Sequence, residues 1–130
     1  MVYIIAFTRA GIVLGKKIQQ SNMVETVVLF GWYKYVQEDA IPFAHTKQLL
    51  EKIWKKADAI VFIGAAGIAV RSIAPFLTDK VNDPAILVMD EKGKFVIPIL
   101  SGHLGGANAY AEQLARKIGA VPVITTATDC

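Results

Sequence analysis

The residues with the most evident capacity for chemistry lie between Ser101 and Asn108, in the stretch SGHLGGAN. His103 stands among glycines there, directly before a segment with helical periodicity. The first N–H groups of a helix have no partner inside the helix, and glycines leave them open to an anion or a reacting oxygen. A histidine in this position can act as a general acid or base or bind an anionic group, although a structural histidine fits the same pattern. We take His103 as the candidate catalytic residue, and its candidate substrate-binding neighbours are Ser101, Gly102, Gly105, Gly106 and Asn108.

Two further stretches place small or polar residues where a strand is expected to end. The first is GAAG, from Gly64 to Gly67, which follows an apolar run and precedes a helical segment containing Arg71. The second is the pair Thr125 and Thr126, which follows a short apolar segment. Both stretches are candidate substrate-binding sites. The alternatives are close helix–strand packing for the glycines and simple closure of the strand exit for the threonines.

These stretches lack the patterns of common nucleotide sites. GAAG does not have the three glycines of a dinucleotide-binding turn, and SGHLGG lacks the Lys-Ser/Thr pair that ends a P-loop. A nucleotide-binding domain is therefore the weaker hypothesis. His103, Asp129 and Cys130 do not follow any recognised metal-ligand spacing, so we expect no protein-bound metal.

Strand-like and helix-like segments alternate along the chain. Residues 59–63 form an apolar run without a polar residue, as expected for the centre of a parallel sheet covered on both faces. Residues 107–118 have apolar side chains at helical spacing, and Gly119 is the expected C-terminal cap. The turn sequence DEKG separates two apolar segments and predicts a β-hairpin near residues 84–98. The prediction is a three-layer α/β fold with a mostly parallel, Rossmann-like sheet.

That fold predicts where the candidate residues meet. In open α/β sheets, ligands bind outside the carboxyl ends of the strands, near a switch in strand order. We expect at least two of the segments 64–67, 101–106 and 125–129 to share one edge of the sheet.

Composition limits the classes of protein. The 130 residues fit one domain, and 54% are hydrophobic, which favours a packed core over disorder. No apolar run approaches the ~18 residues of a membrane span. A single cysteine excludes an internal disulfide and is typical of a reducing cytoplasm. The net charge of +3 comes from scattered basic residues, so we expect no nucleic-acid partner and no membrane partner.

Three patches of the sequence together resemble one family. They are GAAGIAVRSIAP (Gly64–Pro75), DPAILVMDEKGKFVIPILSGHLGGAN (Asp83–Asn108) and PVITTATD (Pro122–Asp129). In order and spacing they are similar to the CbiG family of anaerobic cobalamin biosynthesis. The resemblance implies a cobalt-precorrin-5A hydrolase, which opens the δ-lactone of a cobalt-bound tetrapyrrole and releases acetaldehyde. It also implies that no separate cofactor is needed, because the substrate carries the cobalt.

The chain is shorter than the family members that it resembles. We therefore expect residues 1–130 to form a single α/β domain, either part of a longer protein or a separately encoded half. A C-terminal family domain or a second copy of the chain is the expected protein partner. The alternative function is a non-catalytic tetrapyrrole-binding module that needs the further domain for activity. In either case we expect Arg71 and the open N–H groups to bind carboxylates of the substrate.

Overall fold

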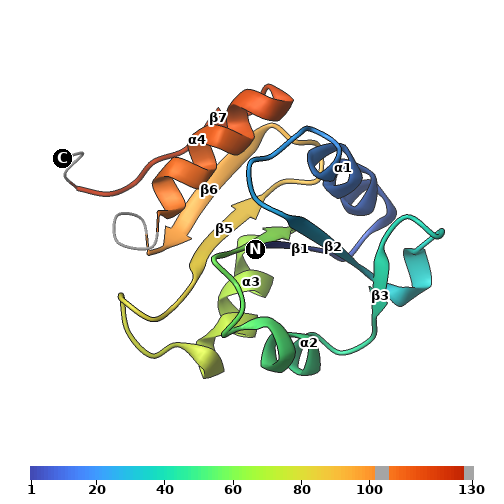
Figure 1. The fold of residues 1–130 in the computed structure, drawn as a ribbon, viewed down its shortest axis with the longest axis horizontal. Coiled ribbons are helices and arrows are strands. Elements are labelled where there is room, and N and C mark those ends of the chain that lie inside the picture. Colours follow the sequence, from blue (N-terminus) through green and yellow to red (C-terminus); the bar gives the residue numbers. More distant parts are fainter. Residues whose placement is uncertain (102–105, 128–130) are drawn as a thin grey trace.

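The computed structural model describes residues 1–101 and 106–127. Within them the strands form one seven-stranded sheet in the order β3-β2-β1-β4-β5-β6-β7 (Figure 1). The strands are β1 (Val2–Ala6), β2 (Val27–Trp32), β3 (Ile41–Phe43), β4 (Ala59–Ile63), β5 (Ala85–Met89), β6 (Phe95–Leu100) and β7 (Val121–Pro122). The helices are α1 (Arg9–Gln19), α2 (Thr46–Ile53), α3 (Ala66–Ile73) and α4 (Ala107–Ile118), with short 3-10 helices η1 (Tyr33–Tyr35) and η2 (Ala74–Phe76).

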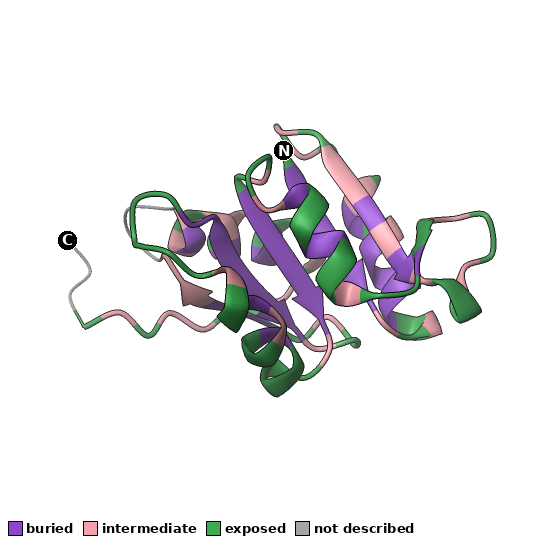
Figure 2. Ribbon diagram, turned by 90° about the horizontal axis from the view of Figure 1, so that it is seen from below, coloured by how far each residue is buried: buried purple, intermediate pink, exposed green. Residues whose placement is uncertain are grey.

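The predicted three-layer architecture is confirmed. Helices α1 and α4 cover one face of the sheet, and α2 and α3 cover the other (Figure 1). β4 is the central strand, and all five of its residues are buried, as the uninterrupted apolar run predicted (Figure 2). Alternate residues of β4 point to opposite faces, so Val61 belongs to the core under α1 and α4, while Ile60 and Phe62 belong to the core under α2 and α3.

Local signals place most helix ends correctly. The Thr8 hydroxyl accepts a 3.0 Å hydrogen bond from the Gly11 N–H and caps α1. Gly119 ends α4 in the left-handed conformation, with φ of 74°. Thr46, a residue type that often caps a helix, is instead the first helical residue of α2, and His45 is the cap, without a side-chain hydrogen bond. α3 ends at Ile73, before Pro75, as expected.

Three apolar residues in or next to helices are exposed, although their spacing in the sequence suggested buried helix faces. Val13 on α1 is 57% exposed, Ile68 on α3 is 46% exposed, and Leu77 after η2 is 43% exposed. α3 buries Ala69 and Ile73, which lie four residues apart on the stripe that faces the sheet. Ile68 lies outside that stripe and therefore stays exposed.

The direction of the sheet reverses between β5 and β6. Strands β1 to β5 are mutually parallel, β6 is antiparallel to β5, and β7 is parallel to β6. The turn between β5 and β6 is held by Asp90, whose carboxylate accepts from the backbone N–H groups of Lys92, Lys94 and Phe95 at 3.2, 2.9 and 2.7 Å. Gly93 takes the positive φ of 70° that the turn requires. The predicted hairpin is thus confirmed.

This reversal places Gly64 and Ser101, the first residues of the two glycine-rich stretches, at opposite edges of the sheet. Gly64 leaves β4 beside Met89, at the carboxyl edge of the parallel strands, where its N–H donates to the Met89 carbonyl at 2.8 Å. Leu100 pairs with Ile86, so Ser101 leaves β6 at the amino edge of the same strands. Five residues of strand correspond to about 16 Å along the sheet.

We predict that Asp90→Ala lowers the free energy of unfolding by about 1–2 kcal/mol, because the backbone N–H groups of the turn lose their shared acceptor. Urea denaturation monitored by far-UV circular dichroism measures the change. Lys92→Ala in the same turn is the matched control and should stay within ~0.5 kcal/mol of the wild type. Equal unfolding midpoints for the two variants would contradict this role of Asp90.

Candidate functional site

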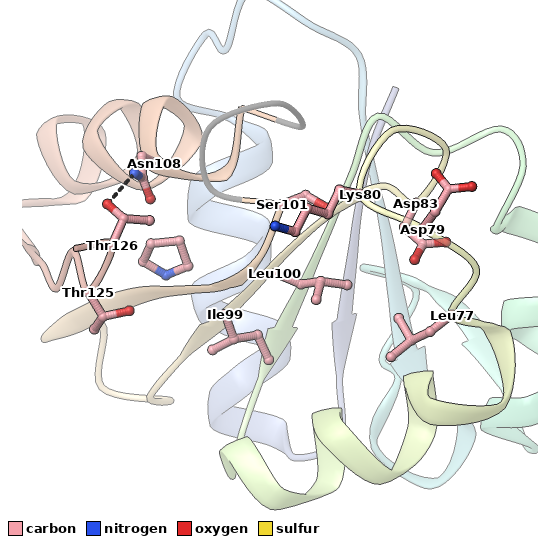
Figure 3. Close-up of a pocket in the computed structure, with 11 residues that line it drawn as sticks. Leu77, Asp79, Lys80, Asp83, Ile99, Leu100, Ser101, Asn108, Thr125 and Thr126 are labelled. Atoms are coloured by element: carbon pink, nitrogen blue, oxygen red, sulfur yellow. Dashed lines mark hydrogen bonds between the residues drawn. The ribbon is translucent and has the colours of Figure 1, made fainter. Parts of the chain in front are cut away.

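A cavity of about 560 Å³ opens at the amino edge of the parallel strands, beyond the carboxyl ends of β6 and β7 (Figure 3). Its volume is within the usual range for small-molecule sites. Three segments far apart in the sequence meet around it. The lining residues are Leu77, Asp79, Lys80, Asp83, Pro98, Ile99, Leu100, Ser101, Asn108, Thr125 and Thr126.

The floor of the cavity is apolar. It is formed by Pro98, Ile99 and Leu100 at the end of β6, with Leu77 facing them from the segment after η2 (Figure 3). Ile99 and Leu100 are half-buried and pack against the core under α2 and α3. The apolar part of a ligand can pack against this floor, most of which belongs to a strand of the sheet.

One wall is polar and is built on the first turn of α4. The Asn108 side chain donates to the Thr126 hydroxyl at 3.2 Å and so ties α4 to the segment after β7 (Figure 3). The Ala107 N–H donates to the Ser101 carbonyl at 3.0 Å, which fixes the end of β6 beside the start of the helix. Thr125 completes the wall. The wall therefore presents hydroxyl and amide groups from segments that hydrogen bonds hold together.

The opposite wall is the loop from Leu77 to Asp83, which its own carboxylates stabilise. Asp83 is only 7% exposed, and it accepts from the Thr78 N–H at 3.0 Å and from the Thr78 hydroxyl at 2.8 Å. Asp79 accepts from the N–H groups of Val81 and Asn82 and from the Asn82 side chain. The hydrogen bonds from Asn82, chiefly that of its backbone N–H, hold the pKa of the Asp79 carboxyl below its ordinary value.

Lys80 lies in the same loop, but its charged group makes fewer contacts than the two carboxylates do. It lines the cavity, and within residues 1–101 and 106–127 no carboxylate forms an ion pair with it. Figure 3 shows its side chain directed across the cavity opening, toward the side on which Ser101 lies. The ammonium group is thus available to an anionic ligand, while both loop carboxylates are occupied by hydrogen bonds.

The cavity unites four of the residues that the sequence singled out: Ser101, Asn108, Thr125 and Thr126. The expectation that two of the three candidate segments share one edge is therefore confirmed. Gly106 lies next to them, as the N-terminal cap of α4 with φ of 79°. The predicted residues Gly102, His103 and Gly105 lie outside the described residues, as do Asp129 and Cys130.

Gly64, Gly67 and Arg71 belong to a different part of the molecule. Gly64 and Gly67 lie at the carboxyl edge, and Arg71 is exposed in the last turn of α3 and does not line the cavity. Their role in substrate binding stays a prediction. The loop from Leu77 to Asp83 was absent from the sequence-based candidates, although its Asp, Asn and Lys residues signalled a polar turn next to a strand.

Over the described ranges, no cluster of three or more His, Cys, Asp or Glu side chains is arranged to hold a metal ion. No helix in these ranges has the length and apolar character needed to cross a membrane.

A family model described as cobalamin synthesis G N-terminal matches residues 48–129. The chain belongs to this family. Membership agrees with the resemblance noted in the three sequence patches.

Relatives that carry the name cobalt-precorrin-5A hydrolase match almost the whole chain. The protein of Salmonella typhimurium is 42% identical over 98% of this chain, and that of Priestia megaterium is 36% identical over 97%. The matches thus include most of the chain before Gly64, where none of the three sequence patches lies. The chain covers 36% and 35% of these two proteins, or about a third of the curated relatives that it matches.

A solved structure has the same fold. The crystal structure of a cobalamin biosynthesis protein G homolog from Sulfolobus solfataricus superposes with a TM-score of 0.76 and 32% sequence identity. The superposition covers 95% of this chain and 36% of that one. The family member described here therefore corresponds to a folded portion of a longer homolog.

We predict that Asp83→Ala lowers the free energy of unfolding by about 1.5–3 kcal/mol, because the Thr78 N–H and hydroxyl lose a buried charged acceptor. Urea denaturation gives the change, and amide hydrogen exchange at Thr78 should accelerate. Glu51→Ala removes an exposed carboxylate on α2 and serves as the control. An unfolding free energy equal to that of Glu51→Ala, with unchanged exchange at Thr78, would contradict a structural role of Asp83 in the cavity wall.

Proposed function

We propose that this chain takes part in the cobalt-precorrin-5A hydrolase reaction and that its cavity binds the cobalt-tetrapyrrole substrate. In that reaction water opens the δ-lactone of the substrate and acetaldehyde is released. The observation that carries the proposal is the match, at 42% and 36% identity over nearly the whole chain, to two proteins named cobalt-precorrin-5A hydrolase.

The cavity has the chemical character that such a substrate requires. A tetrapyrrole has an apolar macrocycle with carboxylate side chains at its rim. The floor of Leu77, Pro98, Ile99 and Leu100 suits an edge of the ring, and the hydroxyl and amide groups of the wall suit the side chains. The site at the edge of the sheet thus supports binding of part of the macrocycle.

Lactone opening needs an activated water and a group that stabilises the developing oxyanion. His103 is our candidate for activation of the water, and the N–H groups of Gly105 and Gly106 are candidates for the oxyanion. Ser101 and Asn108, which line the cavity, precede and follow this stretch in the sequence. The cobalt belongs to the substrate, so the chemistry assigned to the chain is acid–base and hydrogen-bonding chemistry.

A tetrapyrrole-binding module without catalytic activity is the second candidate. It is favoured by the length comparison, because the chain covers only about a third of each named hydrolase. In this case the remaining portion of the hydrolase would supply catalytic groups. The expected partner is that portion or a second copy of the chain.

The two candidates are separated by incubating the purified chain with cobalt-precorrin-5A. Acetaldehyde is measured with a coupled dehydrogenase, and binding is measured by the absorbance change of the tetrapyrrole. Turnover by the chain alone supports the hydrolase, whereas binding without turnover supports the module. The absence of both binding and turnover would contradict both candidate functions.

We predict that His103→Ala lowers the rate of lactone opening by ~10²-fold or more, as expected for loss of a general acid or base. The assay uses the chain alone if it is active, and otherwise the chain together with the rest of a full-length relative. His45→Ala is the matched control, because His45 is the second histidine of the chain and lies exposed at the start of α2. Equal rates for the two variants would remove His103 from the reaction.

A further inference from the structure

The charged side chains around the cavity differ in the contacts that they make with the rest of the protein. Asp79 and Asp83 accept hydrogen bonds from their own loop, which uses their oxygens to build the wall. Lys80 stands between them in the sequence, is exposed, and forms no ion pair within the described part of the chain. A ligand at this wall therefore meets an ammonium group whose charge is not already neutralised by a contact.

Two polar atoms on the opposite wall, one on Ser101 and one on Asn108, are buried. The Ser101 Oγ and the Asn108 Oδ1 form no hydrogen bond with any described residue. A buried polar atom without a partner is unfavourable, and native structures contain few of them. Both residues line the cavity, so a ligand group that enters it can complete their hydrogen bonding once these side chains turn toward it.

The Asn108 side chain can present either a donor or an acceptor to a ligand. Its Nδ2 donates to the Thr126 hydroxyl, and a hydroxyl can accept or donate. When the amide turns over, the Thr126 hydroxyl donates to Oδ1, and Nδ2 faces the position that Oδ1 held. The Asn108–Thr126 bond is kept, and the wall then offers an N–H beside the Ser101 hydroxyl.

We propose that Lys80, Ser101 and Asn108 form a subsite for one carboxylate side chain of the ligand, with the apolar body of the ligand on the floor of Pro98, Ile99 and Leu100. The Lys80 ammonium supplies the opposite charge, and the Ser101 hydroxyl and the Asn108 amide supply hydrogen bonds. The two polar atoms are shielded from solvent, and hydrogen bonds in such a place are stronger than at the surface. This inference rests on the proposed function, since it assumes that the ligand is a tetrapyrrole with carboxylates at its rim.

The subsite differs from the one expected from the sequence. Arg71 and the N–H groups after Gly64 and Gly105 were the predicted carboxylate ligands. Of these, Arg71 and the turn at Gly64 do not line this cavity. Lys80 takes the corresponding role at the amino edge. Lys80 and Arg71 are both exposed, so replacing either residue is not expected to disturb the core.

The test compares two probes, a cobalt corrin with free side-chain carboxylates and the same corrin with the carboxylates converted to methyl esters. Binding of each to the 130-residue chain is measured by absorbance or calorimetry. We expect the wild type to bind the free acid at least tenfold more tightly than the ester. Lys80→Met should weaken binding of the acid by about ten- to hundredfold and leave binding of the ester unchanged.

Further variants separate the subsite from a general effect of charge. Lys80→Arg should keep most of the affinity, because it keeps the positive charge. Asn108→Asp keeps the size of the side chain and the bond to Thr126 but places a negative charge beside the ligand, so it should weaken binding of the acid by at least tenfold. Lys47→Met removes one exposed charge from α2 and should change neither affinity. Circular dichroism confirms that each variant is folded.

The outcomes distinguish this inference from the proposed function. Equal binding of acid and ester by the wild type, with Lys80→Met equal to Lys47→Met, would overturn the carboxylate subsite while tetrapyrrole binding stands. Failure of the wild type to bind either corrin would overturn the proposed tetrapyrrole binding, and the subsite with it.

Discussion

The reversal of chain direction at Asp90 is the constraint on which the site depends. Five parallel strands bring their carboxyl ends to one edge of the sheet, and a sixth parallel strand would have delivered Ser101 to that edge as well. The Asp90 carboxylate instead gathers three backbone N–H groups into a tight turn, and β6 returns antiparallel to β5. Ser101, the first turn of α4 and the segment after β7 therefore meet the loop that precedes β5. The turn therefore brings the apolar floor and the polar wall of α4 opposite the loop from Leu77 to Asp83.

The resulting site differs from the usual arrangement of open α/β sheets in an instructive way. Ligands in these folds bind at the carboxyl ends of strands, and the cavity does lie at the carboxyl ends of β6 and β7. These two strands run opposite to the other five, so the same edge is the amino edge of the parallel portion. The rule holds locally for the reversed strands. The glycine-rich turn after β4 stays at the far edge, where its helix-start N–H groups are separate from the cavity.

The sequence predicted the elements well because short-range patterns determine them. The apolar run of β4, the periodicity of α4, the Thr8 and Gly119 caps and the DEKG turn all have local physical causes. It predicted burial less well, since Val13 and Ile68 have helical spacing but fall outside the stripe that meets the sheet. It missed Lys80 because the proximity of its loop to Ser101 depends on the register of β5 and β6, which is a long-range property. The predicted hairpin already implied that Gly64 and Ser101 lie at opposite edges, so this part of the site was within reach of sequence reasoning.

Family membership and cavity geometry together support the proposal that the tetrapyrrole binds at the amino edge of the parallel strands. The most direct test is a titration of the isotope-labelled chain with a cobalt corrin, followed by the NMR shifts of the backbone amides. We predict that the largest shifts appear at Lys80, Ser101, Asn108 and Thr126. Shifts confined to Gly64, Gly67 and Arg71 would contradict it and would place the ligand at the opposite edge of the sheet.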